Sequence, residues 1–252
     1  MFFNKDPIHV FKSSELQNLA NKYKPGYLLA KPWPHAVIDN FLPAKLANRL
    51  SEVFPKYDDE MWLDWRTRSI EHQPKKLGIG HAERFEGAHP VLHNIIYSMC
   101  SFPFLKCLET ITGIRNLLPD PYLIGGGVHQ ILSGGHLDVH ADFNYVPELG
   151  LYRRINVLLY LNKNWKSEYN GDLELWSDDP VCHVKSIEPI MNRLVIFSTT
   201  KNALHGHPKA LNTPEHITRK SIALYYYTAN ADADELYDGN TDWVTFNGSR
   251  KN

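Results

Sequence analysis

Two histidines and an aspartate stand at positions where β-strands would bring them together. His140 and Asp142 are two residues apart in the segment Leu137–Asp142, so on an extended strand their side chains point to the same face. His205 follows a second apolar segment, Arg193–Phe197. Two imidazole nitrogens and one carboxylate bind one face of a divalent metal ion and leave other positions open, which is the ligand pattern of non-haem Fe(II) oxygenases. The sequence therefore predicts a metal site of this type.

The third ligand has two candidates, His205 and His207, and we choose His205 with His207 in a supporting role. Asp138 shares the face of His140 and Asp142, and a polar face of this kind is costly to bury unless its charges are paired or bound to metal. An isolated His-x-Asp pair is commonly an incidental hydrogen-bonded pair, and 13 histidines make chance matches frequent. The ordered combination of the pair, a distal histidine and a later cationic strand favours the metal.

An anion-binding pair opens the last long apolar strand of the chain. Arg219 and Ser221 are two residues apart, so both side chains face the same way. An arginine can hold a carboxylate through two parallel hydrogen bonds, and the serine hydroxyl adds a third. Tyr160, in the strand Val157–Asn162, has a phenol that can donate to the same carboxylate. These residues predict a clamp for a dicarboxylate co-substrate, although strands often open with a surface arginine and strand tyrosines often belong to the core.

The elements that must position these residues are mostly strands. From Tyr122 onward, short apolar runs alternate with Gly and Asx clusters, which is typical of a sandwich or jelly roll and not of alternating β/α units. We therefore expect a mainly β fold with helices (α+β), built on a double-stranded β-helix. The expected strands are His35–Ile38, Val128–Leu132, His136–Ala141, Ile155–Leu161, Leu173–Trp176, Val184–Ile190, Leu194–Ser198 and Ser221–Thr228.

Apolar residues at helical spacing predict helices over residues 43–55, 90–102 and 104–112, the last ending at Gly113, and a short helix over 14–23. We expect the N-terminal helices to pack on one outer face of the jelly roll. The chain of 252 residues fits a single domain. Its parts would be a helical support with a candidate lid (1–120), the catalytic jelly-roll core (121–230) and a tail (231–252).

Residues 57–87 are polar and irregular, and they predict either a lid over the site or a solvated surface loop. The stretch between Trp62 and Arg84 contains Arg66 and Arg68, which together with Arg84 would suit an anionic substrate if this stretch is a lid.

Composition narrows the class of partner. The 27 basic and 28 acidic residues nearly cancel, so we expect neither nucleic-acid nor membrane binding. Three cysteines, Cys100, Cys107 and Cys182, have no paired spacing, which indicates free thiols in a reducing compartment. The start of the sequence lacks the long apolar run of a signal peptide. We therefore expect a cytoplasmic protein, of unspecified oligomeric state.

Taken together, these segments resemble the 2-oxoglutarate- and Fe(II)-dependent oxygenases of the prolyl-4-hydroxylase-like superfamily. The blocks that carry the resemblance follow the family order, and they are "PHAVIDNFLPAKLANRL", "GGGVHQILSGGHLDVHADFN", "RRINVLLYLNKNW", "GDLELW", "NRLVIFSTT" and "RKSIALYYYT". The resemblance assigns the iron ligands to His140, Asp142 and His205, and the far carboxylate of 2-oxoglutarate to Arg219 with Ser221 beside it. Tyr160 occupies the place of the co-substrate tyrosine in hypoxia-type prolyl hydroxylases.

One departure concerns the clamp. The stretch between His205 and Arg219 is longer than in typical animal prolyl hydroxylases, so we expect the loop Pro208–Thr218 to bulge out. Lys220 is the alternative clamp residue, although its side chain should face the other way.

The resemblance implies Fe(II), 2-oxoglutarate and O2, with ascorbate as a candidate reductant, and hydroxylation of an unactivated C–H bond. The expected substrate is a prolyl residue of a protein or peptide; a small molecule or sugar is the alternative. A jelly-roll metal-dependent isomerase, or a binding module that does not use 2-oxoglutarate, would explain the same pattern. If the strand registers are right, four residues lie near the iron and contact the substrate, namely His129, Gln130, Asn144 and Trp176.

Overall fold

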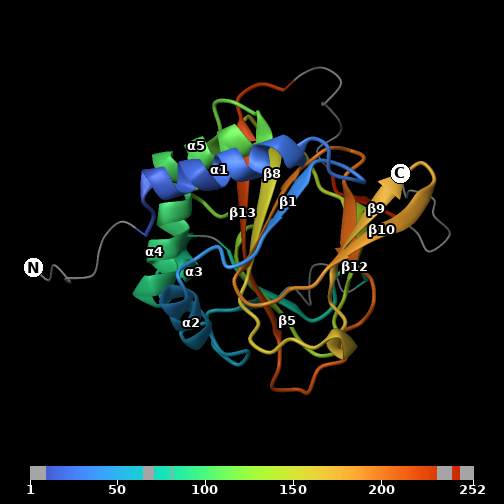
Figure 1. The fold of residues 1–252 in the computed structure, drawn as a ribbon. Coiled ribbons are helices and arrows are strands. Elements are labelled where there is room, and N and C mark those ends of the chain that lie inside the picture. The colour runs from blue at the N-terminus through green and yellow to red at the C-terminus, as the bar shows by residue number, and fades with distance from the viewer. Residues whose placement is uncertain (1–9, 65–70, 81, 232–239, 245–252) are drawn as a thin grey trace, which may run out of the picture.

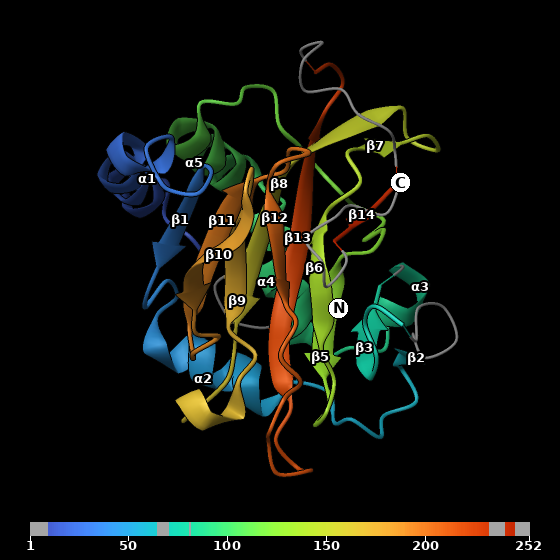
Figure 2. The ribbon, with the colours of Figure 1, turned by 90° about the vertical axis from the view of Figure 1, so that its right-hand side faces the viewer.

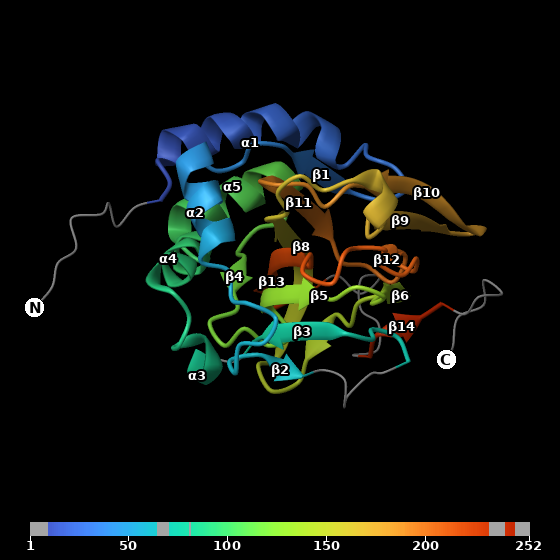
Figure 3. The same cartoon turned by 90° about the horizontal axis from the view of Figure 1, so that it is seen from below.

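Two antiparallel β-sheets face each other, and helices lie against the outer face of the larger sheet (Figures 1 and 3). The computed structural model describes residues 10–64, 71–80, 82–231 and 240–244. Its helices are α1 (Ser13–Tyr27), α2 (Ala44–Glu52), α3 (Ala82–Phe85), α4 (Pro90–Met99) and α5 (Phe102–Thr112), with a 3₁₀ turn at Ser167–Tyr169.

The sheets form the jelly roll expected from the sequence. The larger sheet has the order β1 (His35–Ile38), β11 (Arg193–Ser198), β8 (Leu151–Tyr160), β13 (Arg219–Thr228), β5 (Gly127–Ile131), β3 (Lys76–Ile79) and β2 (Leu63–Asp64), with β4 (Leu118–Pro119) beside β13 and β7 (Tyr145–Val146) beside β8. The smaller sheet, which Figure 2 shows in front of the larger one, has the order β10 (Val181–Ile187), β9 (Leu173–Asp178), β12 (Leu204–His207), β6 (Leu137–Ala141) and β14 (Asp242–Trp243).

The central strands β8 and β13 are covered on both faces, which explains their long apolar runs. Residues with one parity form the main core with the helices, and these are Ile155, Val157, Leu159, Ile222, Leu224 and Tyr226. Residues with the other parity face the smaller sheet and line the space between the sheets, and these are Asn156, Leu158, Tyr160, Arg219, Ser221, Ala223 and Tyr225. The alternation of side chains along a strand therefore separates a structural face from a functional face.

The ends of the helices carry residues that commonly start and stop helices. Helix α5 carries Pro103 in its first turn and ends at Gly113, whose φ of 79° is accessible to glycine at little cost. Tyr226 of β13 donates a hydrogen bond of 3.0 Å to the Met99 carbonyl oxygen and so ties the sheet to α4. Among the described residues, no single helix is long and apolar enough to span a membrane. Helices α4 and α5, which meet at a 49° bend, have the length and apolar composition of a span when they are taken together.

Three stretches differ from the sequence expectations. Residues 57–87 contain β2 and β3, which extend the larger sheet, so this stretch is not an unstructured excursion. The expected strand Val184–Ile190 lies earlier, at Val181–Ile187, because it forms a hairpin with β9. The stretch 231–252, expected to be a tail, contributes β14, which pairs with β6. Strands of two to four residues are too short to show a period of two in sequence.

Asn192 connects the entry of α2 to the turn before β11. Its side-chain amide donates to the Leu42 carbonyl oxygen at 2.8 Å and its side-chain oxygen accepts from the Leu42 N–H at 2.9 Å. The residue is buried and has a φ of 62°.

We expect Asn192→Ala to lower the free energy of unfolding by about 2–4 kcal/mol, because two buried backbone groups lose their partners and alanine is strained at positive φ. Asn192→Gly also loses these hydrogen bonds, but glycine is not strained at positive φ. Its loss of unfolding free energy should therefore be roughly 1 kcal/mol smaller than that of Asn192→Ala. Urea unfolding followed by circular dichroism measures both variants. An alanine variant as stable as the parent would show that this link is unimportant.

Candidate active site

A cavity of about 380 Å³ lies between the two sheets, and residues of β14 and β3 contribute to its wall. Its described lining combines residues from the inner faces of β5, β6, β8, β12 and β13 with the metal-ligand candidates. Cavities that bind small ligands usually measure about 300–1,000 Å³, so the space suits a co-substrate together with the reacting end of a second molecule.

The metal-ligand candidates meet where the smaller sheet pairs β6 with β12. His205 lies directly opposite His140 in this ladder, and Asp142 follows the end of β6. One ligand atom from each of the three side chains lies within 4.8 Å of the others. The Nε2 atoms of His140 and His205 are 3.6 Å and 3.4 Å from the Asp142 carboxylate oxygens. Strand register, which the sequence does not give, thus brings His205 into the group.

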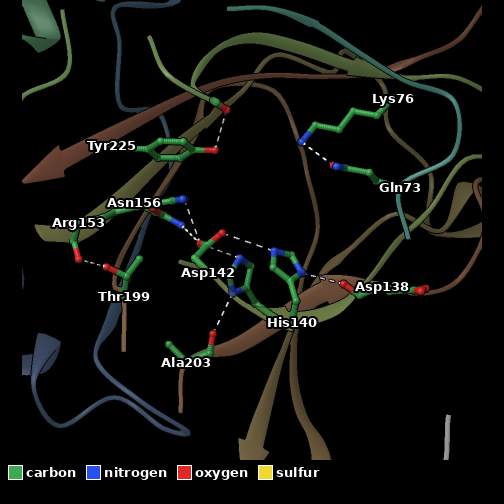
Figure 4. Close-up of polar contacts among 12 residues, drawn as sticks. Gln73, Lys76, Asp138, His140, Asp142, Arg153, Asn156, Thr199, Ala203 and Tyr225 are labelled. Carbon is green, nitrogen blue, oxygen red and sulfur yellow. Dashed lines mark hydrogen bonds and ion pairs between the residues drawn. The ribbon is translucent and has the colours of Figure 1, made fainter. Parts of the chain in front are cut away.

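The protein fixes the tautomers of both histidines. Nδ1 of His140 is 2.8 Å from the Asp138 carbonyl oxygen, and Nδ1 of His205 is 2.9 Å from the Ala203 carbonyl oxygen (Figure 4). A carbonyl oxygen only accepts hydrogen bonds, so each Nδ1 carries the proton and each Nε2 presents its lone pair to the group. Burial lowers the pKa of His205 to about 4, and this keeps the imidazole neutral. The donor set fits an Fe(II) ion bound on one face.

Two neighbours orient the Asp142 carboxylate. Arg153 donates to Oδ2 at 3.0 Å and Asn156 donates to the same oxygen at 2.6 Å. Burial alone would raise the pKa of this carboxyl, but the Arg153 guanidinium, with His205 and His140, outweighs burial and holds the pKa well below its usual range. Arg153 is itself buried, and its guanidinium lies 3.4 Å from the ring centre of Tyr225. The carboxylate is therefore ionised and held in place before any metal binds.

The anion clamp lies on the larger sheet, across the cavity. Arg219 is buried, and it donates to the Gly171 carbonyl oxygen at 2.6 Å and to the Tyr160 hydroxyl at 3.1 Å. Ser221 lies between Tyr160 and His129 in the strand register. Arg219, Tyr160 and Ser221 all line the cavity, whereas Lys220 does not belong to its lining. The structure thus places Arg219, and not the alternative Lys220, where a co-substrate carboxylate would bind.

The loop between β12 and β13 bulges away from the sheets, as the sequence suggested. It is tied down by backbone hydrogen bonds between Leu211 and the Gly134–Gly135 turn, and by one from the Asn212 N–H to the Tyr169 carbonyl oxygen. These bonds let β13 begin in register although the loop is long.

His207 lies in the cavity wall but outside the metal group. Its Cα is paired with Leu137 and not with His140. The side chain is buried, and neither ring nitrogen has a hydrogen-bond partner among the residues that the structure describes. An ordered water or a bound molecule is the usual partner of such a buried imidazole, and the supporting role expected for His207 stays a prediction.

The expected substrate residues are only partly where the sequence suggested. His129 lines the cavity, but the lining includes neither Gln130, Asn144 nor Trp176. Gln130 has the opposite parity on β5, and its side-chain oxygen accepts a hydrogen bond from Thr218 at 2.8 Å. Trp176 pairs with Leu204, so it packs on the outer face of the smaller sheet with Val139 and Ala141. Asn144 is buried near the Arg153 backbone. The expectation that Gln130, Asn144 and Trp176 contact the substrate near the iron is therefore wrong, because none of them lines the cavity.

The stretch expected to be a lid or a solvated loop contributes Gln73 and Lys76 to the cavity lining, but the residues at its two ends do not reach the cavity. Trp62 is buried against Phe54 in the main core, and its carbonyl oxygen accepts a hydrogen bond from Arg84 at 3.4 Å. Neither Trp62 nor Arg84 lines the cavity. Arg66 and Arg68 lie outside the described residues.

Several cavity residues were missed by sequence reasoning, namely Gln73, Lys76, Phe143, Arg153, Asn156, Tyr225 and Trp243. The parity of Tyr160 on its strand would have identified Asn156, and that of Ser221 would have identified Tyr225. Lys76 gave no signal because β3 is short and lies in a polar stretch. Trp243 stacks on His72, with ring centres 4.3 Å apart, and its own ring centre is 4.8 Å from that of His140.

We expect Arg153→Met to weaken Mn(II) or Zn(II) binding about 10- to 100-fold, because the Asp142 carboxylate loses the cation that orients and ionises it. Arg154 is the matched control, since its side chain bonds Thr228 and the Asn230 backbone instead. Titration calorimetry with both variants measures the difference. Equal affinities in Arg153→Met and Arg154→Met would rule out the orienting role.

Lys76 generates a prediction about stability. Its pKa is lowered to about 8, mainly because burial penalises the ammonium. A lysine whose folded pKa lies below its unfolded value destabilises the fold at lower pH, and the penalty fades as pH rises from about 8 to about 10.5.

We therefore expect Lys76→Met to raise the free energy of unfolding at pH 7 by about 1–3 kcal/mol, with a gain that shrinks between pH 8 and 10.5. Lys163→Met, at an exposed position, should change stability by less than about 0.5 kcal/mol. Urea unfolding as a function of pH tests this. A destabilised Lys76→Met at pH 7 would contradict it.

Comparison with known proteins agrees with this geometry. Residues 126–227 match the family model described as the 2OG-Fe(II) oxygenase superfamily. Mouse prolyl 3-hydroxylase OGFOD1 is 34% identical over 79 residues, which are 30% of this chain and 14% of that protein, so the match spans a small part of that relative's length.

Solved structures show the same fold. A prolyl hydroxylase from Trichoplax adhaerens, in complex with a hypoxia inducible factor peptide fragment, superposes with a TM-score of 0.58 at 22% identity, over 85% of this chain and 91% of that chain. A prolyl 4-hydroxylase from Phytophthora capsici gives a TM-score of 0.55 at 19% identity, over 93% and 70%. The match of residues 126–227 to this family model, the jelly-roll fold and the two-histidine, one-carboxylate group agree with one another, and the core of the chain is similar to the 2OG-Fe(II) oxygenase superfamily.

Proposed function

We propose that this protein is a 2-oxoglutarate- and Fe(II)-dependent dioxygenase that hydroxylates an unactivated C–H bond of a prolyl residue in a protein or peptide. One observation carries the reaction class. The group His140, Asp142 and His205 and the clamp Arg219 with Tyr160 line the same cavity from opposite sheets. A metal-dependent isomerase or a binding module would have no use for the buried clamp.

When bound, Fe(II) with 2-oxoglutarate and O2 supplies the oxidation, in which the keto acid becomes succinate and CO2 and one oxygen atom enters the substrate C–H bond. The protein supplies position and environment. His140 and His205 present Nε2 to the ion because their Nδ1 protons are held by backbone carbonyl oxygens. The Arg219 guanidinium, already aligned by Gly171 and Tyr160, pairs with the far carboxylate of the co-substrate. Ser221 adds a hydroxyl beside it.

Apolar side chains close the cavity around these groups. Leu158, Leu173 and Phe197 belong to its lining, and the centre of the Phe197 ring lies 4.8 Å from that of His205. An apolar wall excludes water and strengthens the electrostatic interactions inside.

The choice of a prolyl residue is supported by likeness. One curated relative, which matches over a short stretch, is described as a prolyl 3-hydroxylase, and solved prolyl hydroxylases share the fold. A small-molecule hydroxylase is the second candidate, because the cavity is near the lower end of the size range for ligand pockets. We also propose that the protein works in the reducing cytosol, in keeping with its three free cysteines.

The test is an anaerobic titration of the Fe(II)-loaded protein with 2-oxoglutarate, followed by the visible metal-to-ligand charge-transfer band. We expect a band in the parent protein and none in His140→Ala. Arg219→Met should raise the dissociation constant of 2-oxoglutarate on the order of 10- to 100-fold, because the charge-assisted hydrogen bonds to its far carboxylate are lost. Lys220→Met, on the same strand but outside the cavity lining, should change it less than about twofold.

Iron binding without a band would exclude the co-substrate and favour the isomerase. Equal effects of Arg219→Met and Lys220→Met would exclude the clamp, and no iron binding would leave only a binding module.

A further inference from the structure

Two buried imidazoles in the cavity wall have ring nitrogens without a partner. His129 of β5 and His207 of β12 both belong to the described lining, and the two residues are 6% and 1% exposed. Nε2 of His129 and both ring nitrogens of His207 have no hydrogen-bond partner in the described part of the chain. Buried polar atoms almost always have one, in the protein, in water or in a bound molecule. These nitrogens therefore constrain the chemistry of whatever fills the cavity.

His129 can only accept a hydrogen bond, because its other nitrogen is already used. The imidazole is hydrogen-bonded to the backbone of Gly126, and this contact favours the protonated ring. Since Nε2 has no partner, the bonded nitrogen is Nδ1, which donates its proton to the Gly126 carbonyl oxygen. Burial is the main cause that lowers the pKa of His129 well below its ordinary value, so the ring is neutral at neutral pH. Nε2 thus presents a lone pair, whereas His207 has both a donor and an acceptor and does not discriminate.

The proposed co-substrate cannot satisfy Nε2 of His129. At neutral pH, 2-oxoglutarate carries two carboxylates and a keto group, and the oxygens of all three only accept hydrogen bonds. Ser221 lies opposite His129 in the strand register, but its hydroxyl makes no hydrogen bond to Nε2, and in the proposed function it serves the far carboxylate. A donor for this nitrogen therefore has to come from water or from the substrate.

The surroundings of His129 give a water molecule few partners. A buried water usually makes about three hydrogen bonds. The four nearest positions on this face of the sheet are Gly78 and Ser221 on the neighbouring strands and Gly127 and Ile131 along β5. Of these four residues, Ser221 alone has a polar side chain. This environment favours a donor that belongs to a larger molecule.

The row of side chains that contains His129 leaves room for such a molecule. Across the strands the row runs Gly78, His129, Ser221 and Tyr160, with adjacent side chains about 5 Å apart. The clamp occupies the Tyr160 end of the row, and Gly78 at the other end has no side chain to cover the His129 ring. A molecule that lies beside the co-substrate can therefore reach Nε2.

We propose that the substrate donates a hydrogen bond to Nε2 of His129 from an N–H or O–H group close to the hydroxylated carbon. This inference rests on the proposed function and names a requirement that its substrate must meet. The ring nitrogen of a prolyl residue inside a peptide bears no hydrogen, so in a peptide the donor is the backbone amide of a neighbouring residue. In a small molecule the donor is a hydroxyl. A substrate without a donor leaves a buried lone pair unpaired, and the site selects against it.

The experiment compares matched ligands with and without the donor hydrogen. The full chain is loaded with Zn(II), which does not support oxidation, and saturated with 2-oxoglutarate, and titration calorimetry gives the dissociation constants. N-acetyl-L-proline N-methylamide and its N,N-dimethylamide test the amide that follows the proline. The dimethylamides of acetyl-glycyl-proline and acetyl-sarcosyl-proline test the amide that precedes it. Methyl glucoside and its fully O-methylated form test a hydroxyl.

We expect the ligand with the donor to bind more tightly than its methylated counterpart in at least one pair, by roughly fivefold or more. His129→Leu removes the acceptor and should abolish this preference, whereas His129→Gln, whose side-chain oxygen also accepts, should keep part of it. A preference that came from the bulk of the added methyl group would persist in His129→Leu. The affinity for 2-oxoglutarate should stay within about twofold of the parent in both variants.

Nitrogen NMR of isotope-labelled imidazoles gives a second readout on the parent protein itself. The Nε2 resonance of His129 is identified by its absence from His129→Gln. An unprotonated imidazole nitrogen moves upfield when it accepts a hydrogen bond. We therefore expect this resonance to move upfield when the preferred ligand binds, and to keep the position of an unbonded nitrogen with 2-oxoglutarate alone.

No preference for the donor in any pair, or a preference that survives in His129→Leu, would overturn the inference. A protonated His129 ring in the complex with 2-oxoglutarate would also overturn it, because the imidazole would then donate to the co-substrate. The proposed function fails separately, through the absence of the charge-transfer band with 2-oxoglutarate.

Discussion

The buried carboxylate of Asp142 is the constraint on which the rest of the site depends. An ionised carboxyl inside a protein must be paired, and here the Arg153 guanidinium and the Asn156 amide both donate to one of its oxygens. Arg153 is in turn fixed by the Tyr225 ring and by a hydrogen bond of 2.8 Å to Asn156. Arg153 and Asn156 of the larger sheet thus hold the carboxylate of Asp142, which follows β6 of the smaller sheet, and this ion pair links the two sheets.

The strand alternation of the larger sheet makes this coupling compatible with a stable fold. On β8 and β13 the residues of one parity form the apolar core under α1, α4 and α5, while those of the other parity are free to be polar. The helices pack on one face, so the sheet can expose Arg219, Ser221 and Asn156 to the cavity on the other face and keep its hydrophobic contacts. Stability and chemistry are assigned to opposite faces of the same strands.

The sequence allowed the jelly roll and the members of the metal group to be predicted, because long strands with a period of two and residues in a fixed chain order leave a strong pattern. The choice of His205 over His207 agrees with the structure, but its physical reason, the register of β12 against β6, is not visible in the sequence. Gln130 and Trp176 were misplaced for a related reason. Each is one residue out of register with a cavity-facing neighbour, and a shift of one residue reverses the face. Lys76 and Trp243 lie on strands too short to show any period.

Trp243 has a consequence for how the protein is made. This residue contributes to the cavity wall beside His140, although it lies late in the chain, whereas the earliest described lining residue is Gln73. A polypeptide leaves the ribosome N-terminus first, and its early parts fold while the later parts are still being synthesised. The helices and the larger sheet have all their residues once β13 has emerged, but the wall formed by β14 does not. The nascent protein therefore passes through a stage in which the metal-binding side chains have been synthesised and the part of the cavity wall formed by β14 has not.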